Sequence, residues 1–100
     1  MEKSKYAFLL MGSEFTPEKQ QAHFETEKRH TYIFTIQNFE QAKEKVLELQ
    51  REGFGALELC GAFGENRCRE LIELTENKIA IGYSVHLPFQ DSLFNAFFSG

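Results

Sequence analysis

The chain has 100 residues, enough for one folded domain but too few for two that would each bury a core of their own. Its composition, 42% hydrophobic and 26% charged, is that of a globular protein and excludes a disordered tail or a fibrous repeat. With 11 Lys and Arg against 15 Asp and Glu, the net charge of -4 argues against nucleic acid as a partner. The unusual count is 11 Phe with no Trp, more large apolar surface than one small core readily buries.

The N-terminal segment and the cysteines bear on location. The apolar run at residues 6–11 is too short for the core of a signal peptide, and no run approaches the roughly 20 residues of a membrane helix. Cys60 and Cys68 lie in apolar settings without the spacing of a zinc site, which favours free thiols in a reducing compartment. We therefore expect a cytoplasmic protein that does not associate with membranes.

The first third of the chain predicts strands. The continuous apolar run 6–11 is typical of a strand covered on both faces, and residues 31–36 are rich in β-branched and aromatic side chains. Residues 22–27 alternate in polarity, which favours a hairpin with residues 31–36. Thr16 followed by Pro17 instead resembles the start of a helix, so residues 16–27 could be helical or extended. We favour a short helical turn after Thr16, followed by the hairpin.

Two amphipathic helices alternate with the later strands. Asn38 can cap the first helix, with Gln41 completing a capping box and Gly53 ending it. The second helix is predicted from about residue 65 to residue 76, between strands at 56–60 and 79–85. Strand, helix, strand, helix, strand from 31 to 85 implies consecutive right-handed βαβ crossovers. The fold class is therefore α/β, a single domain over residues 1–100 with a mostly parallel or mixed five-stranded sheet.

A ligand site is expected at the carboxyl edge of this sheet, where strand-to-helix loops and helix N-termini converge. Gly61 and Gly64 flank one such turn, and the backbone N–H groups of residues 64–66 would lie free at the positive end of the second helix. Gly-x-x-Gly is only a fragment of a phosphate-binding pattern, so the alternative is a tight turn that needs glycine for its backbone angles. The candidate ligand-binding residues are Gly12, Ser13, Asn38, Gly61, Gly64, Glu65 and Asn66.

Glu58 is a carboxylate in a strand that should be central. Alternation would put Glu58 and Cys60 on one face, and His86 ends a neighbouring strand. The three could be catalytic, with Glu58 as general acid or base, Cys60 as nucleophile or acid and His86 as their proton partner. The alternative is structural: a paired carboxylate, a small buried thiol and a histidine at a strand end.

Two histidines flank the predicted hairpin turn. With Glu25 and Glu27, His23 and His30 offer a possible metal cluster. Alternation would point most of these side chains into solvent, and no tight ligand spacing appears. We therefore expect a solvated hairpin and no metal site.

Three stretches of the sequence carry a family resemblance. They are Leu-Glu-Leu-Cys-Gly-Ala-Phe-Gly at residues 57–64, the opening at 6–12 and the step Gly82-Tyr83-x-Val85-His86. They resemble a family of small uncharacterised bacterial proteins classed as a domain of unknown function. The resemblance covers most of the chain. It implies the register of the strands and no established activity, cofactor or catalytic set.

Three functions therefore stay open. The first is a small cytoplasmic protein that binds a small anionic molecule at the carboxyl edge, the second a lyase or isomerase that uses Glu58, Cys60 and His86, and the third a structural subunit. The tail at 88–100 bears on assembly, because four of its large apolar side chains can share a helical face. We expect a homo-oligomer, a dimer or larger, with this tail in the interface. The tail residues concerned are Phe89, Leu93, Phe94, Phe97 and Phe98.

Overall fold

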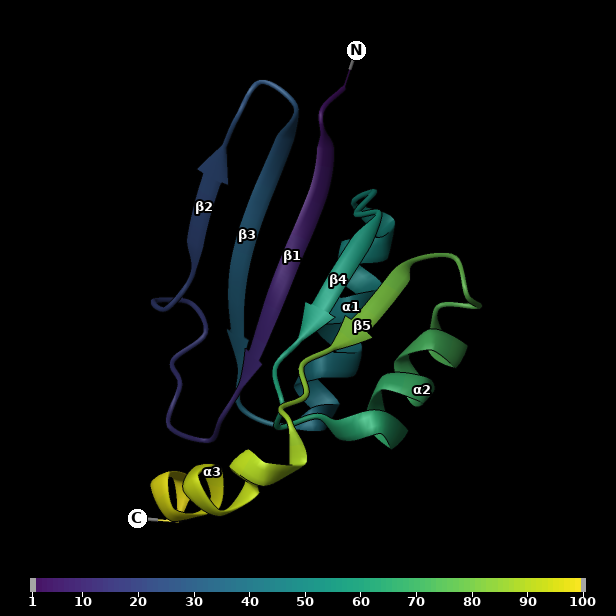
Figure 1. Ribbon diagram of the computed structural model, residues 1–100. Helices are drawn as coiled ribbons and strands as arrows, with labels where there is room; N and C mark the ends of the chain where they lie inside the picture. The colour runs from purple at the N-terminus through teal and green to yellow at the C-terminus, as the bar shows by residue number, and fades with distance from the viewer. Residues whose placement is uncertain (1, 100) are drawn as a thin grey trace.

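A computed structural model describes residues 2–99, so Met1 and Gly100, the two ends of the expected domain, lie outside the described residues. Figure 1 shows a sheet with helices beside it. None of the helices within residues 2–99 has the length and apolar content needed to cross a bilayer. In chain order the elements are β1 (Ser4–Met11), β2 (Ala22–Glu25), β3 (Arg29–Ile36), α1 (Phe39–Arg51), β4 (Ala56–Leu59), α2 (Gly64–Leu74), β5 (Ala80–Tyr83), the 3-10 helix η1 (Pro88–Gln90) and α3 (Asp91–Phe98).

The strands form one five-stranded mixed sheet in the order β2-β3-β1-β4-β5. β1 pairs in parallel with both β3 and β4, β4 pairs in parallel with β5, and β2 pairs antiparallel with β3. This confirms the predicted single α/β fold with consecutive βαβ crossovers. It adds that the first strand of the chain is the central one, because β1 fills the position between β3 and β4.

The two alternatives for residues 16–27 resolve as a turn followed by a hairpin. The N–H groups of Lys19 and Gln20 both donate to the Thr16 carbonyl oxygen at 3.0 Å, which makes a turn that does not extend into a helix. β2 is shorter than predicted and ends two residues before position 27. The reason is that Thr26 turns the chain: its Oγ1 accepts a hydrogen bond from the N–H of Arg29 at 3.2 Å.

The helices begin and end within two residues of the expected positions. Asn38 caps α1, since its Oδ1 accepts a hydrogen bond from the Gln41 N–H at 2.9 Å. Gln41 does not close the predicted box onto Asn38. Its Oε1 instead accepts from the N–H of Gln37 at 2.8 Å, one residue earlier. Gly53 follows α1 in a left-handed conformation with φ of 86°, as expected of a residue that ends a helix.

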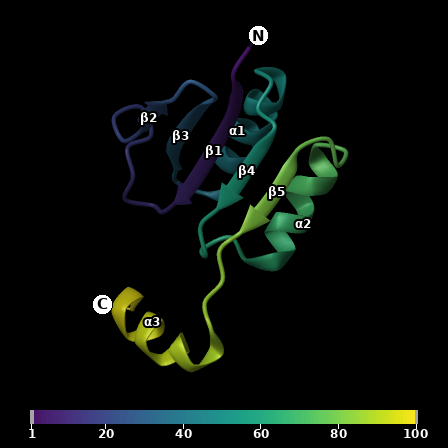
Figure 2. The ribbon, with the colours of Figure 1, turned by 45° about the horizontal axis from the view of Figure 1, so that its top comes forward.

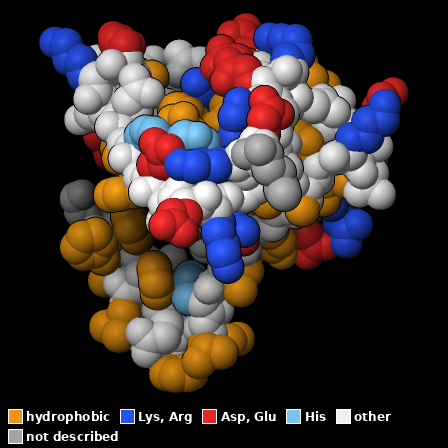
Figure 3. All heavy atoms as spheres, turned by 90° about the horizontal axis from the view of Figure 1, so that it is seen from above, with side chains coloured by type: hydrophobic (Ala, Val, Ile, Leu, Met, Phe, Trp, Pro, Cys, Tyr) orange, Lys and Arg blue, Asp and Glu red, His pale blue; other side chains and the backbone are white. Residues whose placement is uncertain are grey.

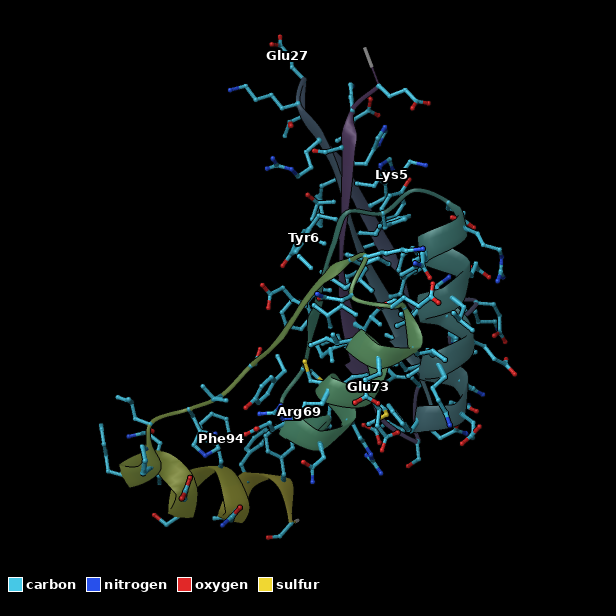
Figure 4. All side chains as sticks on the ribbon, turned by 90° about the vertical axis from the view of Figure 1, so that its right-hand side faces the viewer. Lys5, Tyr6, Glu27, Arg69, Glu73 and Phe94 are labelled. Carbon is cyan, nitrogen blue, oxygen red and sulfur yellow. The ribbon has the colours of Figure 1, made fainter. Side chains whose placement is uncertain are left out.

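Both long helices cover the same face of the sheet (Figure 4). The buried side chains between the sheet and these helices include Ala7, Leu9, Ile36, Leu57 and Leu59 from strands and Ala42, Val46, Leu49, Cys68 and Leu71 from helices. Strand alternation turns the intervening side chains to the opposite side, where neither α1 nor α2 lies. We call this side the bare face and define it by Tyr6, Phe8, Leu10, Phe24, Ile33 and Glu58. The expectation that residues 6–11 are covered on both faces is therefore not met within one chain.

The C-terminal segment projects from the domain as an arm, which we define as residues 85–98. Figures 2 and 4 show η1 and α3 beyond the carboxyl ends of β4 and β5, on the side of the bare face. The main contact of α3 is with η1, directly before it in the chain. Seen from above in Figure 3, hydrophobic side chains gather on this projecting part. The arm is thus an apolar element that does not join the core of its own domain.

Candidate functional site

The turn from β4 into α2 has the backbone shape that the glycine pattern predicts. The Phe63 N–H donates to the Cys60 carbonyl oxygen at 3.1 Å, and Gly64 follows with φ of 74°, a left-handed angle that favours glycine. Phe63 occupies the N-cap position and is buried, so no side-chain oxygen caps the helix. The N–H groups in the first turn of α2, at Gly64, Glu65 and Asn66, therefore face the carboxyl edge without a capping partner.

Two cations lie beside this helix start and share one aromatic ring. Arg67 Cζ is 5.3 Å from the centroid of the Phe39 ring, and Lys43 Nζ is 5.2 Å from it. Phe39 in turn contacts Phe63 edge to face, with ring centroids 6.5 Å apart. Lys43 also forms an ion pair with Glu40 at 3.0 Å, whereas Arg67 forms none within residues 2–99. Among the residues that the structure describes, the guanidinium of Arg67 at the carboxyl edge therefore has no ion-pair partner.

Sequence reasoning missed both Arg67 and Phe39. The signal that could have found them is topological: α1 and α2 both start at the carboxyl edge, so the first turns of the two helices lie near each other. Phe39 is the first residue of α1 and Arg67 the fourth of α2. Their contact depends on which strands are neighbours, and periodicity along the chain does not specify that.

The other predicted ligand residues have partners or lie apart. Asn38 Oδ1 is used as the cap of α1, and Glu65 forms an ion pair with Arg69 at 2.6 Å. The Gly12 N–H donates to the Ile36 carbonyl oxygen at 3.0 Å, which extends the β1–β3 pairing by one bond. Ser13 is exposed in the loop after β1. Of the predicted ligand residues, those at the start of α2 keep polar backbone groups free.

Glu58 lies on the bare face, in register with Phe8 of β1 and Gly82 of β5. A Cβ atom added to Gly82 would stand 3.2 Å from Glu58 Oε2, so the carboxylate lies over this glycine. Burial, and secondly the charge of Glu58, raise the pKa of the Tyr6 phenol. Tyr6 was not predicted as a site residue. Alternation places Tyr6 on the same side of β1 as Phe8, which is the residue in register with Glu58, and this could have indicated Tyr6.

Cys60 and His86 have other partners. β4 ends at Leu59, and Cys60 Sγ accepts a hydrogen bond from the Met11 N–H at 3.3 Å while packing against the core. His86 Nε2 lies 2.6 Å from Asp91 Oδ1, and its ring stacks on Phe94 with centroids 4.0 Å apart. Within residues 2–99, no hydrogen bond or ion pair joins Glu58, Cys60 and His86 to one another. The histidine instead fixes the start of the arm.

The hairpin brings together three side chains from the group that the sequence pattern predicted to point mostly into solvent. His23 Nε2 and His30 Nδ1 lie 2.9 Å apart, and a carboxylate oxygen of Glu25 completes a set of three ligand atoms within 4.8 Å of one another. The His23 ring stacks on Tyr32 with centroids 4.3 Å apart. Glu25 also forms an ion pair with Lys3. The hydrogen bond that Lys3 donates to Glu25 is the chief reason that the pKa of the Glu25 carboxyl is lowered.

Two shallow hollows lie away from the bare face. One of about 620 Å³ lies between the loop at 16–21, the end of β3 and α1, where Glu18, Glu44 and Glu48 line it. The other, of about 570 Å³, lies between β5 and α2 and is lined by Glu65 and Arg69 among others. Lys45 also lines the first hollow and pairs with Glu48, so its three carboxylates still leave an excess of negative charge, which disfavours an anion there.

Fold and site together define a two-layer α/β protein with both long helices on one side of the sheet, a polar helix start at the carboxyl edge and a bare apolar face. The chain belongs to the family of unknown function DUF6506, whose model matches residues 4–99. This confirms the resemblance to a family without an assigned activity. No curated protein and no solved structure matches the chain.

Proposed function

We propose that this protein binds a small anionic molecule at the carboxyl edge of its sheet, against the first turn of α2. One observation carries the proposal: α2 begins without a side-chain cap, and Arg67 lies beside that start without a carboxylate partner within residues 2–99. Uncapped N–H groups and the positive end of the helix dipole favour negative charge. The two free cysteines are consistent with a reducing, cytoplasmic setting.

The chemistry of the edge favours a carboxylate or a phosphate group. A guanidinium presents paired donors that match the oxygens of either group, and stacking on Phe39 limits the freedom of Arg67. Gly61 is exposed, and the absence of a side chain there leaves room for a ligand atom to approach the backbone. Because the chain as a whole carries a charge of -4, the attraction must be local to this edge.

Titration with inorganic phosphate and with small dicarboxylates, followed by NMR of the backbone amides, tests the proposal. We expect shifts centred on Gly64, Glu65 and Asn66. Arg67→Gln should weaken binding by about tenfold or more, because a hydrogen bond to a charged group contributes roughly 1.5–3 kcal/mol. Arg51→Gln, which removes an exposed arginine from the other end of α1, is the matched control and should leave binding unchanged. Equal affinity of the Arg67→Gln variant and the unaltered protein would refute the proposal.

A second candidate is proton-transfer chemistry of the lyase or isomerase type. The observation that favours it is the position of Glu58, a carboxylate on an otherwise apolar strip of sheet with the Tyr6 phenol nearby. A carboxylate can remove a proton next to a carbonyl group while a phenol that stays protonated donates to the oxygen. The geometry therefore favours Tyr6 as the partner of Glu58 over His86, which is engaged by Asp91.

Proton exchange in D₂O tests this second candidate without a known substrate. A panel of 2-oxo and 2-hydroxy acids is incubated with the protein, and NMR follows loss of the ¹H signal on the carbon next to the carbonyl group of the 2-oxo acids or next to the carboxylate of the 2-hydroxy acids. Exchange that disappears in Glu58→Gln and persists in Glu73→Gln, an exposed carboxylate on α2, would support it. Exchange that survives in Glu58→Gln would exclude Glu58 as the base.

A further inference from the structure

We propose that two copies of this chain pair reciprocally, with the arm of each copy covering the bare face of the other. The first observation is the bare face itself. Phe8, Leu10 and Ile33 are only half-buried, and they do not pack against the buried core that α1 and α2 cover. An apolar sheet face is stable when another layer covers it, and α1 and α2 cover only the opposite face. Within residues 2–99 the chain supplies no second layer on that side.

The second observation is the arm, whose large side chains have no surface of their own to cover. Phe89, Phe97 and Phe98 are between 73% and 77% exposed. Together, the seven large apolar side chains of the arm expose on the order of 800 Å², more than the largest apolar patch of a typical monomer. The seven are Val85, Leu87, Phe89, Leu93, Phe94, Phe97 and Phe98.

Contacts around His86 hold the arm together as one unit. The His86 ring lies between Asp91, which it contacts at 2.6 Å, and Phe94, on which it stacks. These contacts tie the linker after β5 to the first turns of α3. Figure 2 shows the ribbon of α3 beyond the end of the sheet, and Figure 4 shows it on the side opposite α1 and α2. An arm that is preorganised in this way can dock on another molecule as a unit, at a lower cost in conformational entropy than a flexible tail.

The occupant is a second copy because both complementary surfaces belong to one chain. The arm contains no Lys or Arg, and its one carboxylate, Asp91, is already paired with His86, so it can lie on an apolar face without leaving a cation unpaired. Reciprocal exchange is a closed twofold arrangement, which limits assembly to a dimer. Two arms and two faces would bury on the order of 1,600 Å² or more, the size of a stable interface.

Light scattering after gel filtration of the full chain tests the pairing, and we expect a mass of twice 11.6 kDa. Phe97→Glu should raise the dissociation constant of the dimer by about thirtyfold or more, as expected for an aromatic side chain at the centre of an interface. Leu74→Glu, at an exposed apolar position on α2, is the matched control and should leave the mass unchanged. A monomer at micromolar concentration, or a dimer that Phe97→Glu does not weaken, would overturn the proposal.

Mixed-label NMR identifies the covered face. In a sample with equal amounts of ¹³C-labelled and unlabelled chains, we expect intermolecular NOEs from the methyl groups of Leu10 and Ile33 to phenylalanine rings of the other chain. The same NOEs confined to one chain would mean that the arm folds back onto its own sheet, and their absence in a confirmed dimer would mean that another surface pairs. Either result would overturn the proposed exchange.

A separate observation carries a second inference: the hairpin cluster of His23, Glu25 and His30 is placed to bind a divalent transition metal, and we infer that it takes Zn²⁺ or a similar ion. Two imidazole nitrogens 2.9 Å apart and a carboxylate oxygen within 4.8 Å are the ligand types that such ions prefer. β2 and β3 hold the histidines on neighbouring strands, and stacking on Tyr32 orients His23. Three protein ligands leave a fourth position open.

Calorimetric titration with Zn²⁺, and the visible absorption of Co²⁺, test this second inference. One ion should bind per chain, and His30→Gln should weaken binding by at least about tenfold. Removing a residue that only orients a metal ligand costs about that much, and His30 would be a ligand itself. His86→Gln retains both hairpin histidines and should bind Zn²⁺ as the unaltered protein does. No binding, or equal weakening in the His86→Gln and His30→Gln variants, would refute a site on the hairpin.

Discussion

Glu58 lies over Gly82, and a Cβ atom at position 82 would stand 3.2 Å from Glu58 Oε2. The contact is with the end of a flexible side chain, so Gly82→Ala should cost less than about 1 kcal/mol of unfolding free energy. In the Glu58→Ala background the same change should become stabilising, because alanine restricts the unfolded chain and no carboxylate is displaced. A double-mutant cycle by urea denaturation should give a coupling above about 0.5 kcal/mol. Additive effects would show that Glu58 does not rest on this glycine.

The Tyr6 phenol should make stability fall at alkaline pH. Its pKa in the folded protein is raised above the ordinary 10.0, first by burial and secondly by the charge of Glu58. Below pH 10 both the folded and unfolded states keep the proton, and between 10 and the raised pKa only the unfolded state releases it, so stability is lost as pH rises. Tyr6→Phe should remove this loss, as measured by urea denaturation between pH 8 and pH 11. Glu58→Gln should lower the Tyr6 pKa only in part, because burial persists.

A side chain at position 64 should destabilise the protein, and the reason is the backbone angle of Gly64. Its φ of 74° is left-handed, and no atom lies within 4 Å of an added Cβ, so Gly64→Ala introduces strain without a clash. We expect a loss of about 1–2 kcal/mol. Gly55→Ala has equal space and no left-handed angle, so thermal or chemical denaturation should show almost no loss there. Equal losses at both positions would contradict this reason.

Asn38 should prove to be a capping residue and not a ligand. Asn38→Ala removes the acceptor of the Gln41 N–H and should destabilise the protein by about 1 kcal/mol. Asn38→Asp keeps an acceptor at the helix N-terminus and should restore most of that stability. If phosphate affinity falls in the alanine variant under conditions where it remains folded, Asn38 belongs to the edge site as well.

The periodicity of the sequence was enough to predict most of the fold. Alternation identified the hairpin, apolar spacings of three and four identified both long helices, and Asn38 and Gly53 marked the two ends of α1. The order of the strands could not be read in the same way, since local pattern does not say that β1 inserts between β3 and β4. The unbroken apolar run of β1 also conceals which face the helices cover.

The parts of the candidate site that depend on local backbone shape were predicted. The parts that depend on which strands and helices are neighbours in space were missed. The turn at Gly61 and Gly64 follows from glycine placement and a strand-to-helix transition. The stacking of Arg67 on Phe39 requires two helices from different crossovers to start side by side. The approach of His23 and His30 likewise depends on cross-strand register, which a one-residue shift would reverse.

The central position of β1 has a consequence for how the chain folds. Its partners are β3, which pairs Leu9 with Phe34, and β4, which pairs Leu9 with Leu59. During synthesis, β1 therefore has no neighbour on one side until residues 56–59 of β4 have been made. Such long-range pairing makes folding slow and leaves an apolar strand open to wrong partners. Synthesis in which residues 6–11 are held by a chaperone until β4 emerges would remove that hazard.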